Sequence, residues 1–83
     1  MLRVLFFASI RERLGRRELA VEADAACTSI AGLVARLDNE LPGCAALLLA
    51  EKTIVAVNRE VVTRDQALRD GDEIAFYPPV TGG

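Results

Sequence analysis

The chain has 83 residues, of which 52% are apolar, and a formal charge of -2, so we expect one small domain with a single core and no separate catalytic domain. No long run of like charges is present, which argues against a disordered chain and against a nucleic-acid-binding surface. No apolar stretch is long enough to cross a membrane, and the apolar residues at the start have no cleavage site after them, so a cytoplasmic protein is expected.

Two paired strands are predicted at the start of the chain. Residues 2–8 are mostly aliphatic and aromatic, which is typical of a strand with apolar side chains on both faces. Residues 11–15 predict a helical turn that ends at a glycine. Residues 18–22 alternate polar and apolar side chains and predict the second strand.

One main helix is predicted next. Thr28 and Ser29 can accept hydrogen bonds from the first backbone N–H groups of a helix. The apolar residues that follow repeat every three or four positions as far as Leu41, and Pro42-Gly43 ends the helix. Residues 45–50 predict one or two further helical turns.

Three strands are predicted in the second half of the chain. Residues 53–57 are rich in β-branched side chains, which is typical of a strand buried on both faces, so we expect it at the centre of the sheet. A tight connection over residues 58–60 leads to a short strand at 61–62. The acidic turn at residues 70–72 leads to a last strand over 73–77.

This order of elements predicts the fold class. Two strands, one helix and further strands describe an α+β domain in which a mixed sheet curls around one main helix. That is the β-grasp, or ubiquitin-like, arrangement. We expect the domain over residues 1–77 and a flexible, extended C-terminal tail over residues 78–83.

Catalysis within the domain is not expected. The chain has no histidine, and Cys27 and Cys44 are too far apart in sequence for a zinc or redox pair and too few for an iron–sulfur cluster. We interpret both as small buried residues, and a reactive thiol stays open as an alternative. The acidic side chains at residues 70–73 are those of a solvated turn. We therefore assign no catalytic residue, no metal site and no bound cofactor.

The C-terminal sequence Pro78-Pro79-Val80-Thr81-Gly82-Gly83 is the most informative segment. The two prolines stop the last strand and hold the chain extended. From Pro79 to Gly83 the chain can reach about 13 Å or slightly more at its maximum rise per residue, far enough to enter a narrow channel. Because glycine has no Cβ, a nucleotide or another reactant could approach the Gly83 carboxylate closely.

Several segments resemble a known family in their order and spacing. They are Val4-Leu5-Phe6-Phe7-Ala8 with Arg11-Glu12, Ala56-Val57-Asn58, residues 70–76, and the C-terminal hexapeptide. The resemblance is to the small subunit of molybdopterin synthase, also called molybdopterin-converting factor subunit 1, a family of ubiquitin-like sulfur carriers. It spans the whole chain and is most specific in the last fourteen residues.

The resemblance implies a non-catalytic sulfur-carrier subunit in molybdenum cofactor biosynthesis. An adenylyltransferase related to ubiquitin-activating enzymes would use ATP to activate Gly83, and a sulfur donor would convert it to a thiocarboxylate. The tail residues Val80, Thr81, Gly82 and Gly83 would then enter the large subunit of a heterotetrameric synthase. There the sulfur would pass to cyclic pyranopterin monophosphate, and two carriers would complete one dithiolene.

The resemblance also implies a docking surface on the exposed sheet face beside the tail. The sequence supports this independently, because Phe7 and Tyr77 fall on the strand faces opposite the predicted core residues and would form an exposed apolar patch. We expect Val61 to be its third member and Arg11 to add a charged contact at its edge. No membrane or nucleic-acid partner is expected.

Two alternatives remain open from the sequence. One is a sulfur carrier of the same fold that serves thiamine, cysteine or tRNA thiolation. The other is a ubiquitin-like binding module whose tail is inert. Both would share the predicted fold, so only the chemistry of Gly83 and the identity of the partner separate them from the leading hypothesis.

Overall fold

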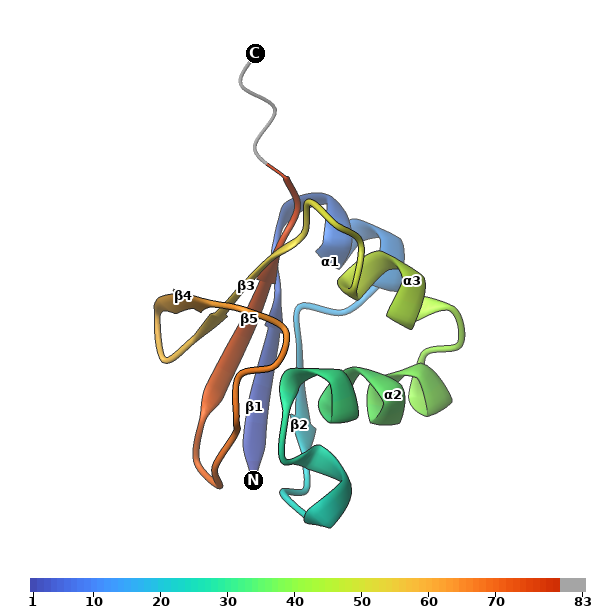
Figure 1. Ribbon diagram of the computed structural model, residues 1–83. Helices are drawn as coiled ribbons and strands as arrows, with labels where there is room; N and C mark the ends of the chain where they lie inside the picture. Colours follow the sequence, from blue (N-terminus) through green and yellow to red (C-terminus); the bar gives the residue numbers. More distant parts are fainter. Residues whose placement is uncertain (80–83) are drawn as a thin grey trace.

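The computed structural model describes residues 1–79. In this range a five-stranded mixed sheet carries three α-helices on one side, as Figure 1 shows. This is the predicted α+β, β-grasp arrangement, with an 11-residue helix as the main one. The tail predictions for Val80, Thr81, Gly82 and Gly83 lie outside the described residues.

The elements follow the predicted order along the chain. They are β1 (Leu2–Phe6), α1 (Ala8–Leu14), β2 (Glu18–Val21), the 3-10 helix η1 (Ala25–Cys27), α2 (Ile30–Glu40), α3 (Cys44–Leu48), β3 (Ile54–Val57), β4 (Glu60–Val62) and β5 (Glu73–Tyr77). None of the helices in this part of the chain could span a membrane.

The strands lie in the order β2-β1-β5-β3-β4. β1 and β5 are parallel, and Phe6 lies opposite Phe76, whereas the other neighbouring strands are antiparallel. The prediction that residues 53–57 form the central strand is wrong, because β5 occupies the centre and β3 lies one strand from the edge. The run of β-branched residues indicates burial on both faces, but burial does not set the order of strands in a sheet.

The core lies between the sheet and α2. Side chains that alternate along β1 and β5 point to this inner face, and one stripe of α2 packs against them. Phe6 and Phe76 stack across the parallel pair with ring centroids 6.2 Å apart. Besides Phe76, the core members with no exposed surface are Leu2, Val4, Ile30, Leu33, Val34, Leu37 and Ile74. Each such side chain stabilises the fold by about 1.5–3 kcal/mol relative to exposure.

The start of α2 is fixed by a side-chain cap, as predicted for Ser29. Its hydroxyl oxygen accepts a hydrogen bond from the Gly32 N–H at 3.2 Å. The next residue, Ile30, donates its N–H to the Gln66 carbonyl at 3.2 Å. The first bond caps the helix, and the second holds its start to the connection between β4 and β5, so the helix lies at a defined place over the sheet.

The first helix differs from the prediction. α1 begins at Ala8, three residues before the predicted turn, and β1 ends at Phe6 and not at Ala8. Ala8 has a positive φ of 51°, which turns the chain sharply out of the strand. The Phe7 carbonyl then accepts from the Ile10 N–H at 3.1 Å. A positive φ at alanine is uncommon and sequence patterns do not indicate it.

Candidate docking face

An exposed aromatic pair lies at the end of the two central parallel strands. The rings of Phe7 and Tyr77 stack with centroids 4.6 Å apart and planes 9° from parallel. Phe7 is 37% exposed and Tyr77 is 36% exposed. The Phe7 N–H also donates to the Phe76 carbonyl at 3.2 Å, which holds the two chain segments together. Both side chains therefore lie on the outer face of the sheet, as predicted.

A row of small and apolar side chains continues across this outer face. The register places Leu5 beside Ala75, Ala75 beside Ala56, and Ala56 beside Val61. Residues paired in this way point to the same face of a sheet. Val61 is 75% exposed and lies two strands from β5, about 10 Å at the usual strand spacing. The structure thus places Val61 on the predicted face but not against the aromatic pair.

Two shallow hollows on this face share the side chains of Arg3, Leu5 and Phe7. The smaller, of about 170 Å³, is also lined by Arg11 and Arg17. The larger, of about 490 Å³, extends along β5; its further lining residues are Arg59, Glu73, Ala75 and Tyr77. Arg11 therefore lies at the edge of the aromatic pair, where the sequence placed it.

The acidic groups on this face are already paired. Arg3 donates to Glu18 at 3.0 Å and to Glu73 at 3.5 Å. The hydrogen bond with Glu18, and then the charge of that carboxylate, raise the pKa of the Arg3 guanidinium above its ordinary value. Since one arginine holds both glutamates, it leaves their carboxylates less able to attract other cations.

Phe7 also occupies an unusual position for an aromatic residue. It is the N-cap of α1, and its side chain makes no capping hydrogen bond. Helices favour Ser, Thr, Asp or Asn at this position, because their side chains accept from the free N–H groups of the first turn. The ring at Phe7 therefore forgoes the stabilising hydrogen bond that a polar N-cap residue would make.

Several residues of this face were not assigned to the site from the sequence, among them Leu5, Arg17 and Arg59. Leu5 could have been included, because it alternates with the core residues Val4 and Phe6 along β1. Arg17 and Arg59 lie in connections outside the helices and strands, where no periodicity indicates a face. Only the folded chain brings them to the hollows beside Phe7.

The described chain leaves the sheet next to the aromatic pair. Tyr77 is the last residue of β5, and it is followed by the half-buried Pro78 and the exposed Pro79. Figure 1 shows this exit at the end of the sheet opposite the N-terminus. A partner that covers Phe7 and Tyr77 would therefore lie directly beside the start of the predicted tail.

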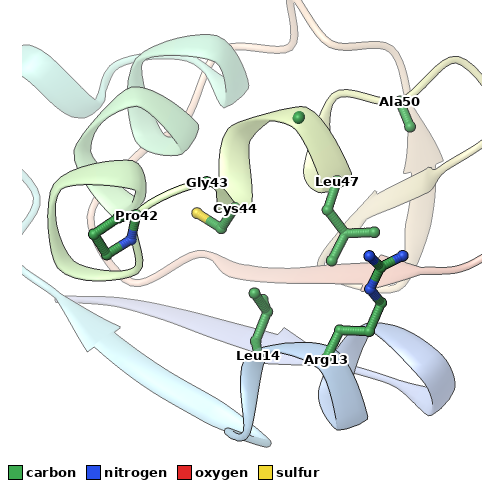
Figure 2. Close-up of a pocket in the computed structure, with 8 residues that line it drawn as sticks. Arg13, Leu14, Pro42, Gly43, Cys44, Leu47 and Ala50 are labelled. Carbon is green, nitrogen blue, oxygen red and sulfur yellow. The ribbon is translucent and has the colours of Figure 1, made fainter.

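A further hollow, of about 470 Å³, lies on the helical side of the molecule. Figure 2 shows that Arg13 and Leu14 of α1 line it from one side and Cys44 and Leu47 of α3 from the other. Burial raises the pKa of the Cys44 thiol, and only 1% of the residue is exposed. Among the residues that the structure describes, none of the predicted site residues lines this hollow.

Both cysteines are free and buried, which agrees with their interpretation as small apolar residues. Within residues 1–79, no three His, Cys, Asp or Glu side chains gather in a group that could hold a metal ion. The exposed aromatic pair on the outer face, next to the start of the tail, is the candidate docking site.

The chain is similar to known proteins over its whole length. The ThiS family model matches residues 4–83. A molybdopterin synthase sulfur carrier subunit from Escherichia coli is 41% identical over 83 residues that cover all of both chains. Small archaeal modifier protein 3 from Haloferax volcanii is 32% identical over 91 residues, which cover 99% of this chain and 98% of the relative.

A solved structure agrees with the fold. The crystal structure of SAMP1 from Haloferax volcanii has a TM-score of 0.84 and 26% sequence identity, with 99% of this chain and 98% of that chain covered. The match in sequence therefore extends through the predicted tail, and the match in structure covers the domain. The chain belongs to the ThiS family.

Proposed function

We propose that this chain is the sulfur carrier subunit of a molybdopterin synthase, and that the Gly83 carboxylate carries the sulfur. The observation on which the proposal rests is the similarity to the Escherichia coli carrier subunit, at 41% identity over the full length of both chains. The match of the family to residues 4–83 includes Gly82 and Gly83. The carrier delivers its sulfur inside the active site of another protein and is not itself the catalyst.

The chemistry begins with activation of a poor electrophile. The Gly83 carboxylate attacks the α-phosphorus of ATP, pyrophosphate leaves, and an acyl-adenylate forms. Hydrosulfide released by the sulfur donor then attacks the acyl carbon, the bond between the acyl carbon and the AMP oxygen breaks, and the thiocarboxylate and AMP are the products. An adenylyltransferase related to ubiquitin-activating enzymes catalyses the activation, and a sulfur donor converts the adenylate to the thiocarboxylate. The carrier provides only the reacting group.

The large subunit of the synthase is the proposed recipient of the loaded tail. It covers the outer face around Phe7 and Tyr77 and receives Val80, Thr81, Gly82 and Gly83 in its active site. Exposed apolar patches of this kind mark binding sites for partners, and aromatic residues dominate the binding energy of many interfaces. Sulfur then passes to cyclic pyranopterin monophosphate, and two carriers supply one dithiolene.

Intact mass spectrometry tests the carrier chemistry. The full chain is incubated with ATP, the adenylyltransferase and a sulfur source, and we expect its mass to rise by the difference between sulfur and oxygen. A variant without Gly83 is the matched control and should stay folded without gaining mass. A wild-type chain that gains no mass under conditions that load the Escherichia coli carrier would contradict the proposal.

A rescue experiment tests the pathway. Expression of the chain in a strain that lacks its own synthase small subunit should restore molybdopterin formation. Failure there, together with rescue of a strain that lacks a thiamine sulfur carrier, would assign the same terminal chemistry to a different pathway.

A further inference from the structure

The charges around the exposed aromatic pair are distributed unevenly. Four arginines and two glutamates line the two hollows on the outer face, which gives these residues a formal charge of +2. The whole chain carries -2, so all the other residues together carry -4. A basic docking face on an acidic protein is attracted to acidic surfaces over distances beyond direct contact.

Three of these arginines are available to a partner. Arg3 holds Glu18 and Glu73, whereas Arg11, Arg17 and Arg59 form no ion pair within residues 1–79. All three are exposed. Arg11 and Arg17 line the hollow on the β2 side of Phe7, and Arg59 lines the hollow along β5. We call Arg11, Arg17 and Arg59 the arginine rim.

The fold holds two members of the rim in place by their backbones. The Arg17 carbonyl accepts a hydrogen bond from the Phe6 N–H at 2.9 Å. Arg59 is the second residue of the tight turn between β3 and β4. That turn is held to the start of β5 by Asn58, which donates to Asp72 and accepts from the Glu73 N–H, both at 3.0 Å.

Arg59 occupies a backbone position that disfavours it. Its φ is +71°, and that of Asn58 is +51°, so the two residues form the kind of hairpin turn in which glycine is preferred at the second position. An arginine here carries local strain that glycine would avoid. A strained residue on a fixed turn beside a binding face indicates a role for its side chain.

We propose that the arginine rim selects the partner, and that the partner's docking site is an apolar pocket for Phe7 and Tyr77 edged by carboxylates. The inference rests on the proposed function, since it concerns the same face and the large subunit that covers it. Apolar contact with the aromatic pair provides most of the affinity, and the rim provides orientation and a faster association rate. The planar guanidinium groups can each bind one carboxylate through two hydrogen bonds.

The test is the binding of the full chain to the large subunit at several salt concentrations. Arg17→Gln and Arg59→Gln remove one rim charge each with little change in shape. Arg69→Gln is the matched control, because Arg69 is exposed but lines neither hollow. Each rim variant should bind about two- to fivefold more weakly, the range of an exposed ion pair. The loss should lie mainly in the association rate and should shrink as salt rises.

A further variant separates the proposed arginine rim from the proposed sulfur-carrier function. Phe7→Asp should greatly weaken binding at every salt concentration. If the rim variants bind like the control while Phe7→Asp fails to bind, the arginine rim is refuted and the proposed function stands. If Phe7→Asp also binds like the wild type, the docking face itself is wrong, and the rim proposal fails with it.

Discussion

Two aromatic pairs, one residue apart in sequence at the ends of β1 and β5, lie on opposite faces of the sheet. Phe6 and Phe76 stack on the inner face with centroids 6.2 Å apart and almost no exposed surface. Phe7 and Tyr77 stack on the outer face at 4.6 Å with more than a third of each residue exposed. Because side chains alternate across a strand, one parallel strand pair carries both a buried aromatic contact and an exposed one.

The comparison teaches that aromatic content alone does not identify a function. The inner pair is buried in the hydrophobic core and contributes to the stability of the domain. The outer pair has no such cover in the described chain and lies where the chain leaves the sheet. Substitutions in the two pairs should therefore change different measured quantities.

The largest effect on the fold is expected at Phe76. Phe76→Ala removes a fully buried ring and should lower the free energy of unfolding by about 3–5 kcal/mol, measured by urea denaturation. Since a domain of this size is stabilised by roughly 4–12 kcal/mol in total, Phe76→Leu serves as a milder companion with a smaller expected loss. A loss below about 1 kcal/mol for Phe76→Ala would break the distinction between the pairs.

The largest effect on binding is expected at Phe7. Phe7→Asp should cost at least about 2 kcal/mol of binding free energy to the large subunit, as for a hot-spot residue, measured by calorimetry. The domain should stay folded, because aspartate is a favoured N-cap and Phe7 is the N-cap of α1. Tyr77→Phe, which keeps the second ring, is the control. An unfolded Phe7→Asp chain would show that the outer pair also supports the core.

A smaller effect on the free energy of unfolding is expected at Ser29, which caps the helix that packs on the inner face of the sheet. Ser29→Ala removes the side-chain cap of α2 and should lower the free energy of unfolding by about 1 kcal/mol, with binding to the large subunit unchanged. Ser29→Asp should retain most of the stability, since it can cap the same helix. Weaker binding by a folded Ser29→Ala variant would mean that the inner layer also shapes the outer face.

The smallest effect is expected at Asp70, at the end of the sheet away from the aromatic pairs. Its carboxylate pairs with the Met1 amino group, and this hydrogen bond lowers the pKa of Asp70 below its ordinary value of 3.8. A lowered carboxyl pKa stabilises the folded state above the ordinary pKa and ceases to do so as pH falls through the folded-state pKa.

The thermal midpoint of Asp70→Asn should therefore be slightly below that of the wild type at neutral pH. The difference should vanish once the pH falls below the folded-state pKa of Asp70, which lies under 3.8. Binding to the large subunit should not change at neutral pH. A difference that grows with acidity would contradict the assigned direction of the pKa shift.

Local chemistry in the sequence was sufficient for most of the elements. The acidic turn before residue 73 and the prolines after residue 77 bound β5 as predicted, because turn residues and proline act within a few positions of their own. Ser29 caps α2 as expected for the same reason. The start of α1 was missed because it depends on the positive φ of Ala8, which no neighbouring residue type indicates.

The candidate site was predictable only in part. Alternation along β1 and β5 was enough to place Phe7 and Tyr77 on the outer face, and Arg11 follows Phe7 closely in the chain. Arg17 and Arg59 come from connections whose side chains have no periodic direction. Their place beside the aromatic pair depends on how β2 and β3 join the sheet.

By itself, the sequence determined most of the local structure of this protein: its strands and helices, and which faces of them are apolar. Those features depend on residues near one another in the chain. The tertiary structure alone decided the strand order, the stacking of Phe7 on Tyr77, and the position of the arginine rim around this aromatic pair. These depend on contacts between residues up to seventy positions apart, such as Phe7 and Tyr77, and only burial of the shared core brings such residues together.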